Sequence, residues 1–448
     1  MPSSIIDSNY YKDMFGTAEM RATFSDEARL EAWIQTEVAL AKAQVALNII
    51  PKGVDTKLQE VATIKNLNLE EMKAEFDKVG FPILPFVKQL NKACDAETAR
   101  WVHYGATTQD ILDTGMVLQI KKGLQIVEKE LQAIIDATAI LAKNHTQTVM
   151  AGRTFQQLAA PITFGYKAGV WLDEMLRHKQ RLQQLKQRIL VGQCAGAVGT
   201  FATLGDKGIE VQELMMKHLE LDAPDITWHT ARDSWAELVS IFAMMAATFA
   251  KIANEVAMLM RSEVGELSEP FEVGRGASTT LPQKRNPISC EPIIAIAPKM
   301  RELASTQLTA MIQEHERGVG QMNIEWMVIP EAFILMSGSL KHIRFIMENL
   351  WVGKETMRKN LDLGGGLLMS EAVMMGLAPK VGKAQAHHLV YAAAGKAFEN
   401  KLTLKEALMA EAEIIEVLSE KEIDELLNPL NYIGVTEKMI EKVINKVQ

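Results

Sequence analysis

The chain has 448 residues, of which 48% are hydrophobic and 23% charged, with a formal net charge of −8. This length is too great for one simple core, and this composition is ordinary for a soluble globular protein. The negative balance argues against a nucleic-acid-binding surface spread over the whole molecule, although a local basic pocket stays compatible with it. The three cysteines lie far apart in the sequence, which fits a reducing compartment without a disulfide framework.

Neither a signal peptide nor a membrane-spanning segment is expected. The N-terminus lacks a basic head followed by an apolar run. The longest uncharged apolar stretch, 238–250, is shorter than a membrane span and is flanked by Glu237 and Lys251. We therefore expect a cytoplasmic protein without a membrane partner.

Helical periodicity is the dominant pattern along the sequence. In the segment 26–48, apolar residues that include Leu30, Ile34 and Val38 recur at spacings of three and four, and Ser25 precedes them as a candidate N-cap. Further long helices are expected over about 111–145, 162–190 and 235–264. The last of these is apolar on all sides in its first half, so other helices must surround it, which favours an oligomer.

Strand alternation is scarce and βαβ repeats are absent, which predicts an all-α fold. We expect three parts: an N-terminal helical domain over 1–105, a central bundle of long helices over 106–355, and a C-terminal helical domain over 356–448.

One central loop differs from the helices around it. The stretch GASTTLPQKRNP, residues 276–287, combines hydroxyl side chains with two adjacent cations and two prolines, and it is a poor helix and a poor strand. A proline-stiffened loop of this kind can present Ser278, Lys284 and Asn286 to one small anion, because positioned donors and cations stabilise an alkoxide. Taken alone, the loop also fits a surface turn with a solvated basic patch.

Motifs for metals and nucleotides are missing from the sequence. There is no GxxxxGK[ST], no HExxH and no CxxC, and the adjacent His387 and His388 sit in a helical stretch where neighbours point in different directions. We expect no metal site, and packing within a helix is the favoured role of these two histidines.

The loop at 276–287 resembles the GSSxMPxKxNP loop of the fumarase/aspartase superfamily. Two further segments agree with that family in order: HYGATTQDILDT at 103–114 and MAGRTFQQLAAPITFG at 150–165. The resemblance covers essentially the whole chain. It implies a three-domain all-α fold whose long helices form a 20-helix core in a homotetramer, with each active site built from three subunits.

The resemblance also implies a chemistry and its residues. Family members remove the proton next to a carboxylate, form an aci-carboxylate, and expel a group from the neighbouring carbon. Ser278 matches the catalytic base, and the positions that match substrate-binding residues are Thr107, Thr108, Thr154, Gln157, Lys284 and Asn286. Because this intermediate is formally dianionic, several hydrogen-bond donors and a cation must be positioned to stabilise it. The resemblance further implies a small polycarboxylate as the ligand and no cofactor.

Two departures point to a particular reaction. Adenylosuccinate lyases typically carry a histidine after GRT and another upstream of the HYG segment, whereas here these places hold Phe155 and the histidine-free stretch 80–90. A basic amine leaves poorly unless an acid protonates it, whereas a carboxylate leaves as a stable anion. The chain most resembles 3-carboxy-cis,cis-muconate cycloisomerases, which interconvert a carboxylated muconate and its lactone. The alternative is a C–N lyase that releases fumarate or a related unsaturated acid from an N-substituted aspartate.

Other cationic side chains lie in segments that resemble the same subfamily. Arg232 and His315 are candidate substrate contacts and His103 is a candidate proton relay, although each also fits a structural role. Some members of the superfamily are inert structural proteins. The joint presence of Ser278, Lys284, Asn286 and Thr154 argues against that reading.

Overall fold

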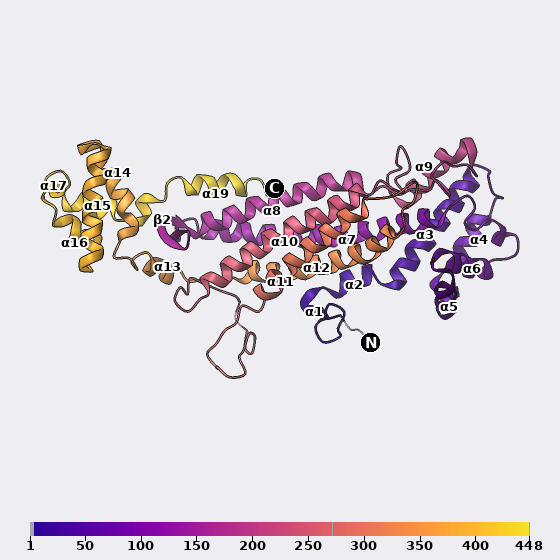
Figure 1. Ribbon diagram of the computed structural model, residues 1–448, viewed down its shortest axis with the longest axis horizontal. Coiled ribbons are helices and arrows are strands. Elements are labelled where there is room, and N and C mark those ends of the chain that lie inside the picture. The colour runs from indigo at the N-terminus through magenta and orange to yellow at the C-terminus, as the bar shows by residue number, and fades with distance from the viewer. Residues whose placement is uncertain (1–3, 271, 448) are drawn as a thin grey trace. The chain divides into compact units, whose positions relative to one another are not determined.

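The computed structural model describes residues 4–270 and 272–447, and its regular structure there is almost entirely helical (Figure 1). The contacts divide the chain into two compact units. Unit 1 comprises residues 1–130, 178–247 and 295–341, and unit 2 comprises 131–177, 248–294 and 342–448. Five long helices each contribute residues to both units: α7 (Thr108–Asn144), α8 (Phe164–Ile189), α10 (Asp233–Leu259), α11 (Cys290–Ala310) and α12 (Gln321–Asn349).

The all-α fold and the bundle of long helices predicted from the sequence are confirmed. The helices expected over 111–145, 162–190 and 235–264 correspond to α7, α8 and α10. The predicted domains are continuous stretches of sequence that meet at residues 105 and 355. The division by contacts instead places the two ends of each long helix in different units, so the three-domain boundaries stay a prediction.

The first long helix, α3 (Asp26–Ala46), begins where its cap predicts. The Ser25 hydroxyl accepts a hydrogen bond from the backbone N–H of Ala28 at 3.2 Å. This bond satisfies one of the free N–H groups in the first turn, and Asp26 and Glu27 complement the dipole there.

Helix α10 is mostly buried, as its composition indicates, but one face that carries Met244 and Met258 is exposed on the single chain. Leu238, Phe242, Met245 and Phe249 are fully buried. Among the described residues, α10 is long and apolar enough to cross a membrane by length and composition, but 72% of that apolar window is buried within the protein. Its hydrophobicity therefore serves packing in the protein core.

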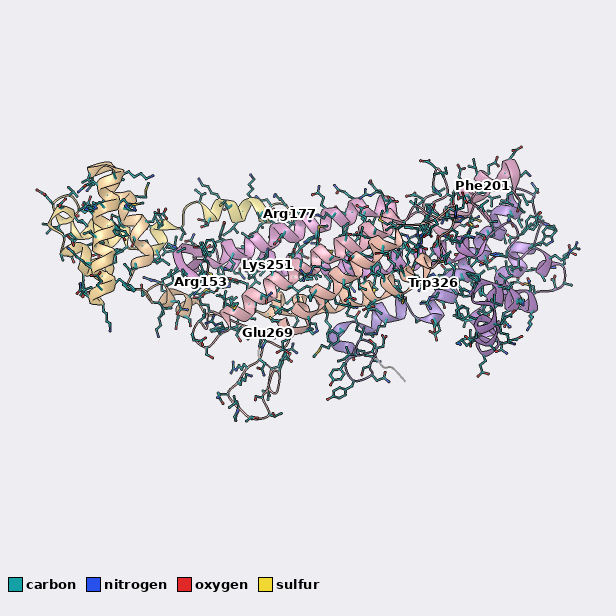
Figure 2. All side chains as sticks on the ribbon, in the orientation of Figure 1. Arg153, Arg177, Phe201, Lys251, Glu269 and Trp326 are labelled. Carbon is teal, nitrogen blue, oxygen red and sulfur yellow. The ribbon has the colours of Figure 1, made fainter. Side chains whose placement is uncertain are left out.

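The N-terminal helices of unit 1 pack around α3. Trp33 of α3 meets Phe86 with the ring centroids 5.6 Å apart, and the partly buried Trp326 packs against the same core (Figure 2). The close approach of α3 to α7 depends on Gly115, because a Cβ at that position would lie 2.7 Å from the Trp33 ring. The other helices of this unit are α1 (Lys12–Phe15), α2 (Ala18–Thr23), α4 (Val54–Val61), α5 (Leu69–Val79), α6 (Ile83–Ala93) and α9 (Gly208–Leu219).

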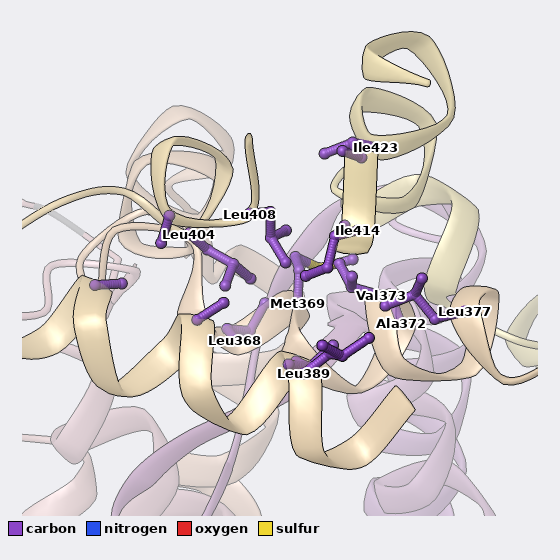
Figure 3. Close-up of a cluster of buried hydrophobic side chains, with 14 of the residues drawn as sticks. Leu368, Met369, Ala372, Val373, Leu377, Leu389, Leu404, Leu408, Ile414 and Ile423 are labelled. Carbon is purple, nitrogen blue, oxygen red and sulfur yellow. The ribbon is translucent and has the colours of Figure 1, made fainter. Parts of the chain in front are cut away.

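The C-terminal helices of unit 2 share one apolar core (Figure 3). Its buried side chains include Met369, Val373, Leu389, Leu404 and Ile414. The helices that contribute to this core are α14 (Ser370–Val381), α15 (Lys383–Asn400), α16 (Leu404–Met409), α17 (Ala412–Ile415) and α18 (Glu420–Leu426). Unit 2 also contains α13 (Lys354–Asn360) and α19 (Thr436–Ile444). Capping boxes start two of them, Thr403 with Glu406 at α16 and Ser419 with Glu422 at α18.

Short strands and 3-10 turns complete the described structure. Strands β1 (Val149–Thr154) and β2 (Gln157–Thr163) form an antiparallel hairpin, and β3 (Leu267–Ser268) pairs with β4 (Trp351–Val352). The sequence analysis did not identify the β1–β2 hairpin. The 3-10 turns span Ile64–Asn66, Thr98–Arg100, Gly205–Lys207, Leu367–Met369 and Pro429–Tyr432.

Candidate active site

The two threonines predicted to bind substrate oxygens stand at the start of α7. Thr107 precedes the helix and Thr108 is its first residue. The backbone N–H of Thr107 donates to Oδ2 of Asp110 at 2.9 Å, and the Asp110 N–H donates to the Thr107 carbonyl at 3.0 Å. Both threonines are half-buried, and their hydroxyls form no hydrogen bond within the described residues. They are available to a ligand at a helix N-terminus, where the dipole favours anions.

Asp110 fixes this helix start to two other segments of unit 1. Its fully buried carboxylate accepts hydrogen bonds from the backbone N–H groups of Ala195 and Gly196 at 3.1 and 2.9 Å. Its Oδ1 also lies 2.8 Å from Nε2 of the buried His229. One acidic side chain thereby joins α7, the glycine-rich segment that follows α8, and the segment that precedes α10.

Arg232 has a different environment from the one predicted for a substrate contact. Its Nη1 and Nη2 donate to the two oxygens of Asp113 at 2.7 and 3.0 Å, and its Nε and Nη2 donate to Glu325 at 2.9 and 2.6 Å. Only 1% of the Arg232 side chain is exposed, and its guanidinium lies 4.8 and 4.2 Å from the ring centroids of Trp228 and Trp235. All three of its nitrogens are engaged by carboxylates, so this geometry favours a structural role.

The charges in this cluster oppose the cost of burial. Burial lowers the pKa of Arg232, but the charges of Asp113 and Glu325 and their hydrogen bonds raise it further than burial lowers it. Burial raises the pKa of Glu325, and Arg232 only partly offsets that effect. The guanidinium therefore offsets part of the cost of burying these two acidic side chains.

The two candidate histidines of unit 1 differ in their surroundings. His103 is half-buried, and its Nδ1 lies 2.6 Å from Oε1 of the buried Glu37. His315 is exposed in the loop between α11 and α12 and has a positive φ of 49°. In that loop Arg317 makes the contacts, because its Nε donates to Gln109 at 2.6 Å and its Nη2 donates to the Ala197 carbonyl at 3.1 Å.

In unit 2, Thr154 and Gln157 form the last residue pair of the β1–β2 hairpin. The two residues between them, Phe155 and Gln156, both have positive φ angles, 50° and 67°, as a type I′ turn requires. Residues other than glycine and asparagine adopt this conformation only at a cost, which the paired strands must outweigh. Phe155 is 99% exposed at the tip of the turn.

Arg153 ties the hairpin to the rest of unit 2. Its Nη1 and Nη2 donate to Glu266 at 3.0 and 2.6 Å, and Glu266 also accepts from Nδ2 of Asn360 at 2.8 Å (Figure 2). The Glu266 carboxylate is fully buried. This bidentate pair holds Thr154 in place through its neighbour in sequence.

The 276–287 loop is an irregular segment between β3 and α11 (Figure 1). The Asn286 backbone and side-chain nitrogens donate to the Gly276 carbonyl at 3.3 and 3.1 Å, so the two ends of the loop are joined. Gly276 has a φ of 68°, and a Cβ there would lie 2.9 Å from the Asn286 carbonyl oxygen. Lys284 is exposed and forms no side-chain hydrogen bond or ion pair within the described residues.

Ser278 occupies a tight turn inside this loop. Its hydroxyl oxygen accepts hydrogen bonds from the backbone N–H groups of Thr280 and Leu281 at 3.2 and 3.1 Å. Two N–H dipoles directed at one oxygen stabilise negative charge on it. The turn therefore favours the alkoxide that a serine base requires.

Glu269 anchors the base of the loop to α11 (Figure 2). Its carboxylate is buried and accepts from the backbone N–H groups of Ser289 at 3.0 Å and Cys290 at 2.8 Å, which precede and begin the helix. On the same side, Arg275 donates to the Ser289 hydroxyl and lies 4.2 Å from the ring centroid of Phe345.

Replacing Glu269 by alanine is expected to loosen the loop. Loss of an acceptor at a helix N-terminus costs about 0.5–2 kcal/mol of unfolding free energy. Trypsin should then cleave faster after Arg275 or Lys284, which mass spectrometry of the fragments would show. The matched control is Glu272→Ala, which removes an exposed carboxylate from the same segment. Equal cleavage rates in the two variants would contradict the anchoring role.

The predicted site residues fall into two sets. Unit 1 holds His103, Thr107, Thr108, Arg232 and His315, and unit 2 holds Thr154, Gln157, Ser278, Lys284 and Asn286. Three cavities of the described structure, of about 480, 280 and 650 Å³, are lined by other residues. The largest of them lies at the base of the 276–287 loop, between Glu269, Glu272, Phe345 and Trp351.

Sequence reasoning missed the acidic residues that organise unit 1. Asp113 lies in the helix expected over about 111–145 and Asp110 lies just before it, and their spacing of three beside apolar neighbours was a usable signal of one buried polar face. Glu37 and Glu325 gave no comparable signal, because each partner is distant in sequence.

Comparisons with known proteins agree with this architecture. A family model described as lyase matches residues 15–301, and one described as adenylosuccinate lyase C-terminus matches residues 366–443. The chain is 37% identical to an N-acetyl-S-(2-succino)cysteine lyase of Dickeya dadantii, over 99% of this chain and 98% of that protein. It is also 37% identical to a 3-carboxy-cis,cis-muconate cycloisomerase of Pseudomonas aeruginosa, over 99% and 97% of the two chains.

The fold is also similar to that of solved structures. The crystal structure of the 3-carboxy-cis,cis-muconate lactonizing enzyme from Pseudomonas putida superposes with a TM-score of 0.93 at 34% identity, over 98% of this chain and 99% of that one. Near-complete coverage in sequence and in structure extends the likeness to every segment that carries a predicted site residue. This chain is an enzyme that belongs to the lyase family of the fumarase/aspartase superfamily.

Proposed function

We propose that Ser278 removes the proton next to a substrate carboxylate and that the neighbouring carbon then releases a group that departs as an anion. The preferred reaction is the interconversion of a carboxylated muconate and its lactone. In the lactone the leaving group is a carboxylate oxygen, which needs no proton to depart. The observation that carries this proposal is Phe155, an exposed side chain at the hairpin tip where a proton-donating histidine is expected for an amine leaving group.

The two N–H groups on the Ser278 oxygen support its role as the base. When the α-proton transfers to the serine oxygen, the electron pair of the C–H bond delocalises into the carboxylate, which becomes formally dianionic. The cation of Lys284 and the hydroxyls of Thr107, Thr108 and Thr154 are the groups proposed to bind that charge, with Gln157 and Asn286 as further amide partners. Such groups act most strongly where the charge develops.

A succinate thioether is the second candidate substrate. A thiolate also departs as an anion, so Phe155 is compatible with it, and the similarity to an N-acetyl-S-(2-succino)cysteine lyase matches the similarity to the cycloisomerase. The C–N lyase alternative is less well supported, since its amine leaving group calls for an acid.

We also propose that the enzyme is a cytoplasmic homotetramer without a cofactor, whose active sites draw on three subunits. The support is the exposure of Thr154, Gln157 and Lys284 on the single chain, because a substrate site must remove such groups from water. Sedimentation is expected to give the mass of four 49.8 kDa chains. Mixing inactive Ser278→Ala with inactive Thr107→Ala/Thr108→Ala subunits is expected to restore part of the activity; no recovery in mixed tetramers would contradict shared sites.

A substrate panel tests the reaction. We expect absorbance changes with 3-carboxy-cis,cis-muconate or its lactone, and no release of fumarate from adenylosuccinate or from simple N-substituted aspartates. N-acetyl-S-(2-succino)cysteine tests the thioether candidate through the appearance of free thiol. Cleavage of the amines without lactone or thiol chemistry would overturn the proposal.

A further inference from the structure

Glu37 and His103 form a pair that the proposed chemistry does not yet use. Glu37 lies on α3 with 1% of its side chain exposed, and both of its carboxylate oxygens contact His103. Oε1 lies 2.6 Å from the His103 Nδ1, and Oε2 accepts the His103 backbone N–H at 3.1 Å. Since a carboxylate can only accept, Nδ1 must carry the proton, and Nε2 is the ring atom that remains.

The turn around His103 is held in a costly conformation. His103 has a φ of 61° and Gly105 a φ of 79°, both in the left-handed region. Helix α3 holds the turn at two positions seven residues apart, because the amide nitrogen of the buried Gln44 donates to the Tyr104 carbonyl at 2.6 Å. The buried side chains of Glu37 and Gln44, on one face of α3, thus hold His103 in this conformation.

The other ring nitrogen of His103 has no partner among the residues that the structure describes. Its Nε2 forms no hydrogen bond or ion pair within the described residues, and 21% of the side chain is exposed. His103 is four residues from Thr107, whose unbonded hydroxyl stands at the start of α7. The ring nitrogen and that hydroxyl therefore belong to one short segment.

Acidic groups on two helices act on His103. Burial lowers the pKa of His103, but the charge and hydrogen bond of Glu37 from α3 and the charge of Asp110 from α7 outweigh burial and raise the pKa above its ordinary value. Cys194 is the other titratable group near both acids, and burial followed by the charges of Asp110 and Glu37 raises its pKa, so the thiol stays neutral. The Nε2 of His229 also lies 2.8 Å from Oδ1 of Asp110.

We infer that Glu37 is a positioning residue that holds His103 as an imidazolium, whose Nε2–H is a cationic donor for a substrate carboxylate bound at the start of α7. The inference rests on the proposed function, because it takes the ligand to be a small polycarboxylate. His103 keeps its proton throughout. It contributes fixed positive charge to a dianionic intermediate rather than a proton to the leaving group.

The test compares Glu37→Gln with the native enzyme. The glutamine oxygen can keep the bond to the His103 N–H, but its amide nitrogen then faces Nδ1 and excludes a proton there. In histidine labelled with ¹³C, NMR titration is expected to show the pKa of His103 above 6.5 in the native protein and below it in the variant, with His103→Asn used for assignment. Affinity for tricarballylate at pH 7 should fall about 10- to 100-fold, the effect of losing a hydrogen bond to a charged group.

The pH dependence has a definite sign. The imidazolium is complete below the raised pKa and is lost as the pH rises through it, so native affinity should decline over that range. The same decline should be absent in His103→Asn. Gln44→Leu is the matched control, since it removes the other bond from α3 to this turn without removing a charge. It is expected to lower stability while leaving the His103 pKa unchanged.

Three outcomes would overturn the inference. One is an unchanged His103 pKa in Glu37→Gln, and another is an equal pKa change in Gln44→Leu, which would show a merely structural role. The third is a changed pKa without a change in tricarballylate affinity. The pKa is measured without substrate, and the role of Ser278 is measured by turnover, so failure of this inference is distinguishable from failure of the proposed function.

Discussion

Ser278→Ala is expected to abolish turnover while leaving the fold and the oligomer intact. The serine oxygen is the group that receives two backbone N–H bonds in the turn, and alanine offers no atom to take the proton. Loss of a general base lowers the rate by about 10²- to 10⁴-fold. The measurement is kcat with 3-carboxy-cis,cis-muconate as substrate, together with circular dichroism and sedimentation of the variant.

A neighbouring hydroxyl provides the control for this loss. Thr279→Ala removes an exposed hydroxyl from the same loop, and its side chain forms no hydrogen bond within the described residues. We expect its kcat to stay within about twofold of the native value. If Ser278→Ala kept near-native activity, or if both variants lost activity equally, Ser278 would not be the base.

Arg232→Met is expected to produce the largest loss of stability. Methionine fills much of the volume but leaves Asp113 and Glu325, both buried, without their cation. Breaking a buried ion pair by removing one partner costs about 3–5 kcal/mol. Urea unfolding at pH 7 should show this difference. It should be smaller at pH 5, because burial already raises the pKa of Glu325 and protonation of that side chain removes its stranded charge.

The matched control is a surface pair of the same type in the same unit. Arg188 donates to both oxygens of Glu237, with 48% and 36% of the two side chains exposed. Arg188→Met should cost no more than about 1 kcal/mol, because solvent screens exposed pairs. A loss in Arg232→Met as small as that would contradict a structural role and would revive Arg232 as a substrate contact.

The sequence by itself determined the long helices of this protein and its family. The spacing of Leu30, Ile34 and Val38 and the cap at Ser25 specify α3 locally, since both signals act within one or two turns. The uncharged stretch 238–250 likewise specified a helix that is mostly buried, with Met244 exposed on one face. The 276–287 loop resembled one superfamily because its residue types and spacing are contiguous in the chain.

The local sequence pattern did not predict the β1–β2 hairpin. A type I′ turn usually carries asparagine or glycine, whereas Phe155 and Gln156 fill it here, so the usual signal for the turn was missing. Pairing of β1 with β2 and the Arg153–Glu266 contact overcome that preference.

Only the tertiary structure decided which charged residues act together. Arg232 looked like a substrate contact in its motif, but Asp113 and Glu325 come from α7 and α12 to engage it. Glu37 and His103 are separated by 66 residues, and no spacing rule links them. The physical reason is burial: a charge enters the interior only with a partner, and the partner is whichever helix the fold brings alongside.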